Sequence, residues 1–106
     1  MNDDDAVFAA LADPTRRALL DRLHETSGQT LSELCGGLGM TRQAVTKHLG
    51  ILEAANLVAT RRQGREKLHY LNPVPIQGIA ARWIGKFQQR QLAALSALKA
   101  ALDKPD

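Results

Sequence analysis

The chain has 106 residues, 44% of them hydrophobic and 24% charged, and its formal net charge is +3 at pH 7. This length and composition predict one globular domain, residues 1–106, and exclude a disordered tail. No apolar run approaches the roughly 18 residues of a membrane span, and the acidic start MNDDD is unlike a signal peptide. A single cysteine excludes an intramolecular disulfide and fits a reducing compartment, so we expect a cytoplasmic protein without membrane contact.

The charges are unevenly distributed along the chain. Residues 1–40 carry three Lys or Arg and seven Asp or Glu, whereas residues 41–70 carry six and two. A charge cluster by itself is usually a solvated face. Here the basic block coincides with a helix pattern described below, and the two together favour a polyanionic partner.

Two helices are predicted at the start of the chain. The first spans residues 3–11, with acidic residues at its N-terminal end, where the helix dipole is positive. The second spans residues 14–25, with Asp13 as N-cap and Pro14 at the first helical position. It is expected to bury its apolar face. The arginines expected to be largely solvated are Arg16, Arg17 and Arg22.

A helix-turn-helix pattern follows. Thr30 and Glu33 have the spacing of a capping box and predict a short helix over residues 31–38 that ends at Gly39. A longer helix is predicted from TRQAVTKHLGIL, residues 41–52. A short helix, a glycine-containing turn and a longer helix are typical of this motif, whose second helix enters the DNA major groove.

The longer helix has two distinct faces. Its apolar positions Val45, Leu49 and Leu52 recur at spacings of four and three, and Thr41 suits the N-cap. The helix is expected to continue to about Ala55. The other face contains no acid and can form hydrogen bonds with base edges or phosphates. Its candidate DNA-binding residues are Thr41, Arg42, Gln43, Thr46, Lys47 and His48.

A β-hairpin is predicted next. Residues 57–62 and 66–71 form its strands around a glycine-containing turn at residues 63–65, and Asn56 is the expected left-handed residue after the helix. A hairpin with cations near its tip is a wing, whose side chains reach phosphates or the adjacent minor groove. Because an isolated hairpin is barely stable in water, it must pack on the helices. The candidate wing contacts are Arg61, Arg62, Arg65 and Lys67.

The last predicted element is a long helix over residues 76–102 with a broad apolar stripe. We expect this stripe to pair with its twin across a two-fold axis, because a small domain would not cover it. The alternative is a long core helix within one subunit. Trp83 and Phe87 could instead line a small-molecule pocket at the dimer axis, although packing is the favoured interpretation. The interface residues expected on this helix are Ile79, Trp83, Phe87, Leu95 and Leu98.

The predicted fold is therefore mainly α with a β-hairpin wing. The segments FAALADPTRRALLDRL and TLSELCGGLGMTRQAVTKHLGILEAANLVATRRQGREKLHYLNP resemble the ArsR/SmtB family of winged helix-turn-helix repressors, from about Val7 to Leu102. The resemblance implies a cytoplasmic homodimer, joined through the first and last helices, that binds an inverted-repeat operator on double-stranded DNA. It would repress transcription, often of its own operon. The first-helix interface residues are then Val7, Phe8 and Leu11.

The resemblance also assigns roles within the candidate DNA-binding set. The polar residues after Met40 match the family's recognition helix, and Arg62 and Arg65 match its wing contacts. Gln43 suits an adenine edge and Arg42 a guanine, each worth ~1–3 kcal/mol of discrimination. The cations of the wing would add affinity that depends on salt and not on sequence. No enzymatic activity is expected, since a phosphate-binding loop and a nucleophile–base pair are both lacking.

The metal sites of the family are not matched. Many relatives sense metals through two cysteines spaced C-x-C on the first helix of the motif, or through Asp, His and Glu on the last helix. Here Gly37 follows Cys35 where the second thiolate would be, and residues 72–106 contain no histidine. Because a tetrahedral site needs about four ligands, no metal and no cofactor are expected. The small-molecule effector, if there is one, stays undefined.

Two alternatives to a metal-independent repressor remain. Modification of Cys35 would disturb DNA docking and make a thiol-based redox- or electrophile-responsive repressor, although a small buried packing residue is the favoured interpretation. The second alternative is a winged-helix module for protein interaction or non-specific DNA binding. The ratio of operator affinity to random-DNA affinity separates a non-specific module from a repressor, because specific binding exceeds non-specific binding by ~10³ or more.

Overall fold

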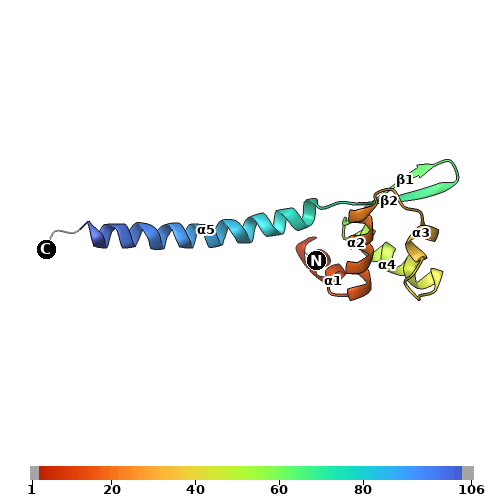
Figure 1. The fold of residues 1–106 in the computed structure, drawn as a ribbon, viewed down its shortest axis with the longest axis horizontal. Helices are drawn as coiled ribbons and strands as arrows, with labels where there is room; N and C mark the ends of the chain where they lie inside the picture. The colour runs from red at the N-terminus through yellow and green to blue at the C-terminus, as the bar shows by residue number, and fades with distance from the viewer. Residues whose placement is uncertain (1–2, 104–106) are drawn as a thin grey trace. The chain divides into compact units, whose positions relative to one another are not determined.

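The computed structural model describes residues 3–103. Its elements (Figure 1) are α1 (Asp3–Leu11), α2 (Pro14–Glu25), α3 (Leu31–Cys35), α4 (Arg42–Ala54), β1 (Val58–Gln63), β2 (Glu66–Leu71) and α5 (Val74–Leu102). This order confirms the predicted mainly α fold with a β-hairpin wing. The chain divides into two compact units, and we describe each by itself. The first, the winged unit, runs up to Ile76, and the second, from Gln77 on, is the rest of α5.

Three of the helices start at the N-cap side chains that the sequence predicts. Asp13 caps α2, and Thr30 and Glu33 form a reciprocal capping box at the start of α3. The Thr41 hydroxyl oxygen caps α4 by accepting a backbone N–H of its first turn at 3.1 Å. Each cap satisfies a backbone donor that the helix itself leaves unpaired, so these side chains determine where the helices start.

The first helix of the motif is shorter than predicted. It was expected to continue to Leu38, but α3 ends at Cys35 and Gly36 is its C-terminal cap. Gly37 and Gly39 have φ angles of 78° and 64°, a left-handed conformation that glycine adopts without a steric penalty. The chain therefore leaves the helix early, and residues 36–41 form the turn that leads to α4.

The core of the winged unit lies where its helices meet the base of the hairpin. It is made of aliphatic side chains that are almost completely inaccessible to solvent. The largest are Val7, Leu19, Leu23, Leu34, Val45, Leu49, Leu52 and Leu57. Val7 was predicted to face a second subunit, but its exposure of 2% places it in the core of its own chain. Its neighbour Phe8 is 51% exposed and remains available at the surface of α1.

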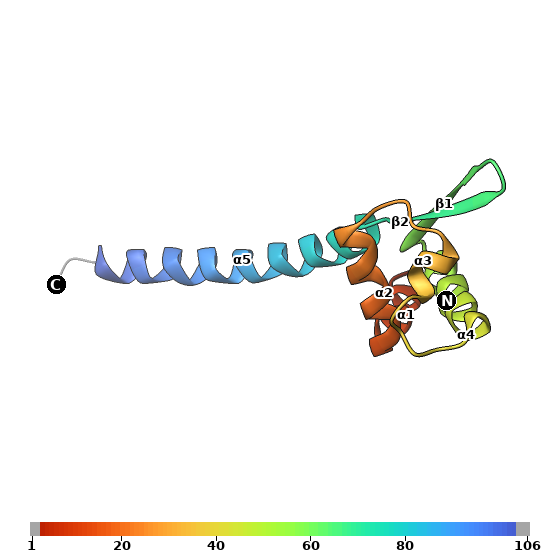
Figure 2. The same ribbon diagram turned by 45° about the vertical axis from the view of Figure 1, so that its right-hand side comes forward.

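The hairpin is antiparallel, with a register that runs from Val58 opposite Leu71 to Gln63 opposite Glu66. Both strands lie within one residue of their predicted bounds, and Gly64 in the turn has a φ of 63°. In both views the tip of the hairpin points away from the helices α1, α2 and α4 of the winged unit (Figures 1 and 2). The predicted left-handed Asn56 is also observed, with a φ of 62°.

The base of the hairpin is anchored by a pairing that the sequence did not reveal. Gln29, in the loop between α2 and α3, pairs with His69 of β2 on the side opposite β1. The backbone N–H of His69 donates to the Gln29 carbonyl at 2.8 Å, and the Nδ1 atom of the imidazole lies 2.9 Å from the same oxygen. His69 is only 4% exposed. The hairpin therefore packs on the helical part of the unit, as predicted.

The three arginines of α2 all donate hydrogen bonds within the chain, and only Arg17 is exposed as expected, whereas Arg16 and Arg22 are half-buried. Arg16 and Arg17 donate to carbonyl oxygens in the last turn of α1, at distances of 2.7, 3.1 and 2.7 Å. Arg22 donates from its NH1 atom to the carbonyl oxygen of Leu34 in α3 at 2.9 Å. Carbonyls at a helix C-terminus have no partner within the helix. The arginines thus join α2 to the ends of its two neighbours in the sequence.

The second unit continues α5, which spans 29 residues and begins two residues earlier than predicted. The Asn72 side chain accepts the backbone N–H of Val74 at 3.3 Å. None of the residues of α5 is buried. Its exposed large apolar residues are Val74, Trp83, Ile84, Phe87, Leu92, Leu95, Leu98 and Leu102.

Candidate nucleic-acid interface

The helix α4 separates an apolar face from a polar one, as its sequence pattern predicts. Val45, Leu49 and Leu52 are at most 2% exposed and fix the helix to the core. The polar face is open to solvent. The candidate DNA-binding residues that are exposed on it are Thr41, Arg42, Gln43, Thr46 and Lys47.

Two of these polar side chains are oriented by partners within the chain. The NH1 atom of Arg42 donates to the Ser32 hydroxyl of α3 at 3.0 Å, so the two helices of the motif meet at this guanidinium. The Thr46 hydroxyl donates to the Arg42 carbonyl oxygen at 2.8 Å. Because that donation uses its only hydrogen, Thr46 can meet a nucleic acid only as an acceptor. Ser32 was not among the predicted site residues, since its contact depends on the packing of α3 on α4.

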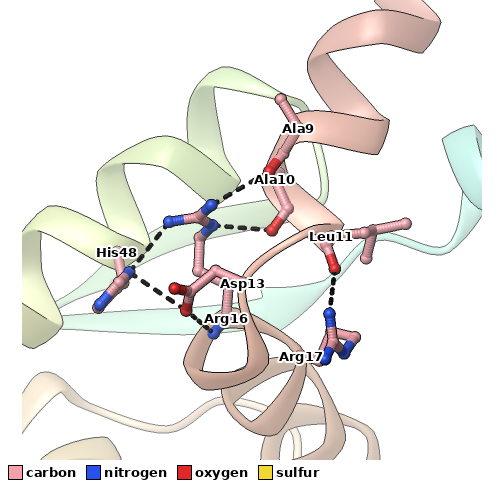
Figure 3. A network of polar contacts seen from close by, with 7 residues as sticks. All are labelled: Ala9, Ala10, Leu11, Asp13, Arg16, Arg17 and His48. Atoms are coloured by element: carbon pink, nitrogen blue, oxygen red, sulfur yellow. Dashed lines mark hydrogen bonds and ion pairs between the residues drawn. The ribbon is translucent and has the colours of Figure 1, made fainter.

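His48 differs from the other five recognition-helix candidates. Its side chain is only 18% exposed, and its Nδ1 atom lies 3.2 Å from NH1 of Arg16 and 3.9 Å from Oδ2 of Asp13 (Figure 3). The backbone N–H of Arg16, donating to the Asp13 carboxylate at 3.0 Å, holds the pKa of that carboxyl below its ordinary value. Desolvation of the carboxyl acts the other way, and the charge of Arg16 lowers the pKa further. The contacts of His48 with Arg16 and Asp13 direct its imidazole toward the start of α2.

The wing presents the predicted cations to solvent. Arg61, Arg62, Arg65 and Lys67 are all exposed, and Arg62 lies opposite Lys67 in the strand register. Like charges at directly opposite positions are unfavourable unless an anion is nearby. One anion is within the chain, because Nζ of Lys67 forms an ion pair with Oε1 of Glu53 in α4 at 3.2 Å. This pair connects the wing to the recognition helix.

A groove of about 460 Å³ lies between the two helices of the motif and the wing. Four cations line it, together with two carboxylates and several hydroxyl groups. The cations are Arg42, Arg62, Arg65 and Lys67, and the acids are Glu53 and Glu66. The fold thus brings predicted residues from α4 and from the hairpin to one surface with a surplus of positive charge. The two acids and the buried His69, which also lines the groove, were not predicted.

Comparison with known proteins gives three results that agree with one another. A family described as a helix-turn-helix domain matches residues 11–61. The HTH-type transcriptional regulator YuzN of Bacillus subtilis is 42% identical over 86 residues, covering 76% of this chain and 94% of that protein. The crystal structure of an ArsR family transcriptional regulator aligns with a TM-score of 0.74 at 33% identity, covering 85% of this chain and 97% of the other.

The chain belongs to the ArsR family of helix-turn-helix transcriptional regulators. Among its relatives is the transcriptional repressor SdpR of Bacillus subtilis, 30% identical over 81 residues that cover 76% of this chain and 88% of that protein. The names of these relatives describe regulators or repressors of transcription. The family resemblance seen in the sequence is thereby confirmed.

Within residues 3–103, no cluster of three or more His, Cys, Asp or Glu side chains has an arrangement that could hold a metal ion. Cys35 is half-buried at the C-terminal end of α3. No helix in the described part of the chain is long and apolar enough to cross a membrane.

The residues predicted for a dimer interface are distributed over both units. In α1, Phe8 is 51% exposed and Leu11 is half-buried, whereas Val7 belongs to the core. In α5, four of the five predicted residues are exposed by more than half of their surface, and Ile79 is half-buried. The four are Trp83, Phe87, Leu95 and Leu98.

Proposed function

We propose that this ArsR-family chain is a sequence-specific repressor that binds an inverted-repeat operator as a homodimer. In this proposal α4 enters the major groove and its exposed polar residues contact base edges. The wing cations contact the phosphates that flank the groove or enter the adjacent minor groove. The response does not depend on metal ions held at the usual family sites.

One observation carries the DNA-binding part of the proposal. The cations of α4 and of the wing line the same groove, although Arg42 and Arg65 are 23 positions apart in the sequence. A phosphodiester strand that leaves the major groove beside α4 must pass toward the wing, and this surface would neutralise it. Glu53 pairs with Lys67 at 3.2 Å and Glu66 is a second acid, so the four cations of the groove still exceed its two carboxylates.

The apolar stripe of α5 supports the homodimeric part. Trp83 and Phe87 are 63% and 62% exposed, and Leu98 is 56% exposed. Large contiguous apolar surfaces of this kind mark interaction sites on soluble proteins. A second copy of α5 is the occupant we propose, because a two-fold pair also presents two recognition helices to two operator half-sites.

The test is a binding titration of the purified protein against the DNA upstream of its own gene and against a scrambled duplex of equal length. It is performed at two salt concentrations, with and without Zn²⁺ and peroxide. We expect operator affinity to exceed scrambled affinity by ~10³ or more and to be unchanged by Zn²⁺. Affinity for both duplexes should fall as salt rises.

Each other outcome identifies a specific failure. Equal, weak binding to both duplexes would contradict sequence-specific repression and favour a non-specific or protein-contact module. Release by Zn²⁺ would contradict the metal-independent response. Release by peroxide that disappears in Cys35→Ser would assign the sensor to that thiol and replace the proposal with a redox-responsive repressor.

A further inference from the structure

Arg16 connects three helices of the winged unit (Figure 3). Its Nε atom donates to the carbonyl oxygen of Ala10 at 2.7 Å, and its NH2 atom donates to that of Ala9 at 3.1 Å. The remaining terminal nitrogen, NH1, lies 3.2 Å from Nδ1 of His48 in α4. The guanidinium of α2 is thus fixed by the last turn of α1 and directed at the recognition helix.

The contact with Arg16 requires Nδ1 of His48 to act as a hydrogen-bond acceptor. A guanidinium is always charged and only donates hydrogen bonds, so Nδ1 of His48 must accept, and the imidazole is neutral with its proton on Nε2. Protonation of Nδ1 would place a second donor and a second positive charge 3.2 Å from NH1. The charged groups against the imidazole are Arg16 and, 3.9 Å away, the Asp13 carboxylate, which would draw a protonated ring away from Arg16.

This hydrogen bond has a direction, as do the Arg42–Ser32 hydrogen bond and the Glu53–Lys67 ion pair at the surface of α4, whereas the apolar packing that holds the helix does not. Val45, Leu49 and Leu52 attach the helix to the core through apolar packing, which permits small rotations about the helix axis. A bond from a fixed guanidinium to one point on the helix restricts that rotation. It therefore restricts the direction in which Gln43 and Lys47, on the exposed face, point.

We propose that His48 is a positioning residue, whose neutral imidazole, held by Arg16, sets the orientation of the recognition helix, so that operator binding weakens when His48 is protonated. The inference rests on the proposed function. It also reverses the role predicted from the sequence, in which His48 contacts DNA itself. The two roles predict opposite changes of operator affinity with pH, because a cationic histidine on a phosphate would bind DNA more tightly in acid.

The experiment compares the operator affinity of the wild type and of His48→Asn at about pH 7.5 and about pH 5.5, the range in which histidine titrates, at constant ionic strength. The Asn oxygen takes the place of Nδ1 as an acceptor and does not titrate. We expect similar affinities at the higher pH. At the lower pH the wild type should lose about fivefold relative to His48→Asn, the effect of one hydrogen bond.

The comparison isolates His48 because His24 and His69 are present in both proteins and their titration cancels in the ratio. Circular dichroism at both pH values confirms that each protein is folded. A ratio that does not change with pH, or a wild type that gains affinity over His48→Asn in acid, would overturn the inference. A wild type that does not discriminate operator from scrambled DNA at about pH 7.5 would instead contradict the proposed function.

A double-mutant cycle gives an independent test. Arg16→Lys keeps the charge but loses the fork that joins α1 to His48. If His48 acts through Arg16, adding His48→Ala to Arg16→Lys should cause no further loss of operator affinity. Additive losses would show that His48 acts on DNA directly. If Arg16→Lys does not fold, the pH comparison decides alone.

Discussion

The winged unit and α5 hold the same kinds of apolar side chains in opposite environments. Leu19, Leu23 and Leu52 of the winged unit are 0% exposed, whereas Leu95 and Leu98 of α5 are 61% and 56% exposed. The winged unit buries most of its large apolar side chains among four helices and a hairpin, although Phe8 stays 51% exposed. A single helix cannot bury its own stripe. The contrast teaches that the winged unit packs its large apolar side chains within itself, whereas α5 leaves them on its surface, where our proposal places a second copy.

The largest effect is expected where the stripe of α5 is broken. Trp83→Asp should produce monomers, because each copy loses about 2 kcal/mol or more and a symmetric dimer contains two copies. The dimer dissociation constant should rise by about a thousandfold. Sedimentation at several protein concentrations measures it, and operator binding should be lost in parallel.

Leu92→Asp is the matched control for this substitution. Leu92 is 65% exposed, as Trp83 is 63% exposed, but nine residues along a helix place it about two and a half turns away, on the opposite face. It should leave the dimer intact. A dimeric Trp83→Asp protein, or equal dissociation by both substitutions, would remove this stripe from the interface.

The second effect concerns the core of the winged unit. Leu23→Ala should lower the free energy of unfolding by about 3 kcal/mol, because it removes buried methyl groups and leaves a cavity. Leu92→Ala, at an exposed position, should change it by less than about 0.5 kcal/mol. Denaturant unfolding at one fixed protein concentration measures both. Equal losses would show that the winged unit and α5 do not differ in the way their burial indicates.

The third effect separates the wing from α5 as a source of DNA affinity. Replacing Arg62 and Arg65 with Ala should weaken binding to all duplexes and reduce the slope of log affinity against log salt by up to about two phosphate contacts. Lys99→Ala, which removes a cation from the last turn of α5, should leave the slope unchanged. An unchanged slope in the wing variant would exclude the wing from the interface.

The smallest effect concerns the start of the recognition helix. Thr41→Ala should destabilise the winged unit by about 1 kcal/mol, because a first-turn N–H of α4 loses its acceptor. Thr41→Ser keeps the hydroxyl and should retain most of the stability. Thermal unfolding of the three proteins measures the difference. Equal stability of the Ala and Ser variants would show that solvent replaces this cap.

Much of the fold was predictable because its determinants are local. The caps at Asp13, Thr30 and Thr41 each act within three residues of their position, and the left-handed Asn56 and the hairpin turn also depend on neighbouring residues. The amphipathic pattern of α4 likewise separated its core face from its polar face. Signals of this kind depend on backbone geometry over one turn of a helix or one hairpin.

Several of the unpredicted features join residues that are distant in sequence. Arg16 contacts His48 across 32 positions, and the carbonyl of Gln29 binds His69 across 40. The arginines of α2 have the spacing of a solvated face, and only the approach of α1 and α3 supplies the carbonyls that they bind. The packing of these helices also buries Val7 in the core and leaves the His48 side chain only 18% exposed, against Arg16.

The sequence by itself determined the order of the elements, the start of each capped helix and the two sets of cations on α4 and the hairpin, because local hydrogen bonding and periodicity suffice for these. Only the tertiary structure decided that those cations share one groove, that Glu53 pairs with Lys67 and that His48 is held by Arg16. Such pairings depend on the distance between side chains of different elements, and that distance exists only after the core has packed.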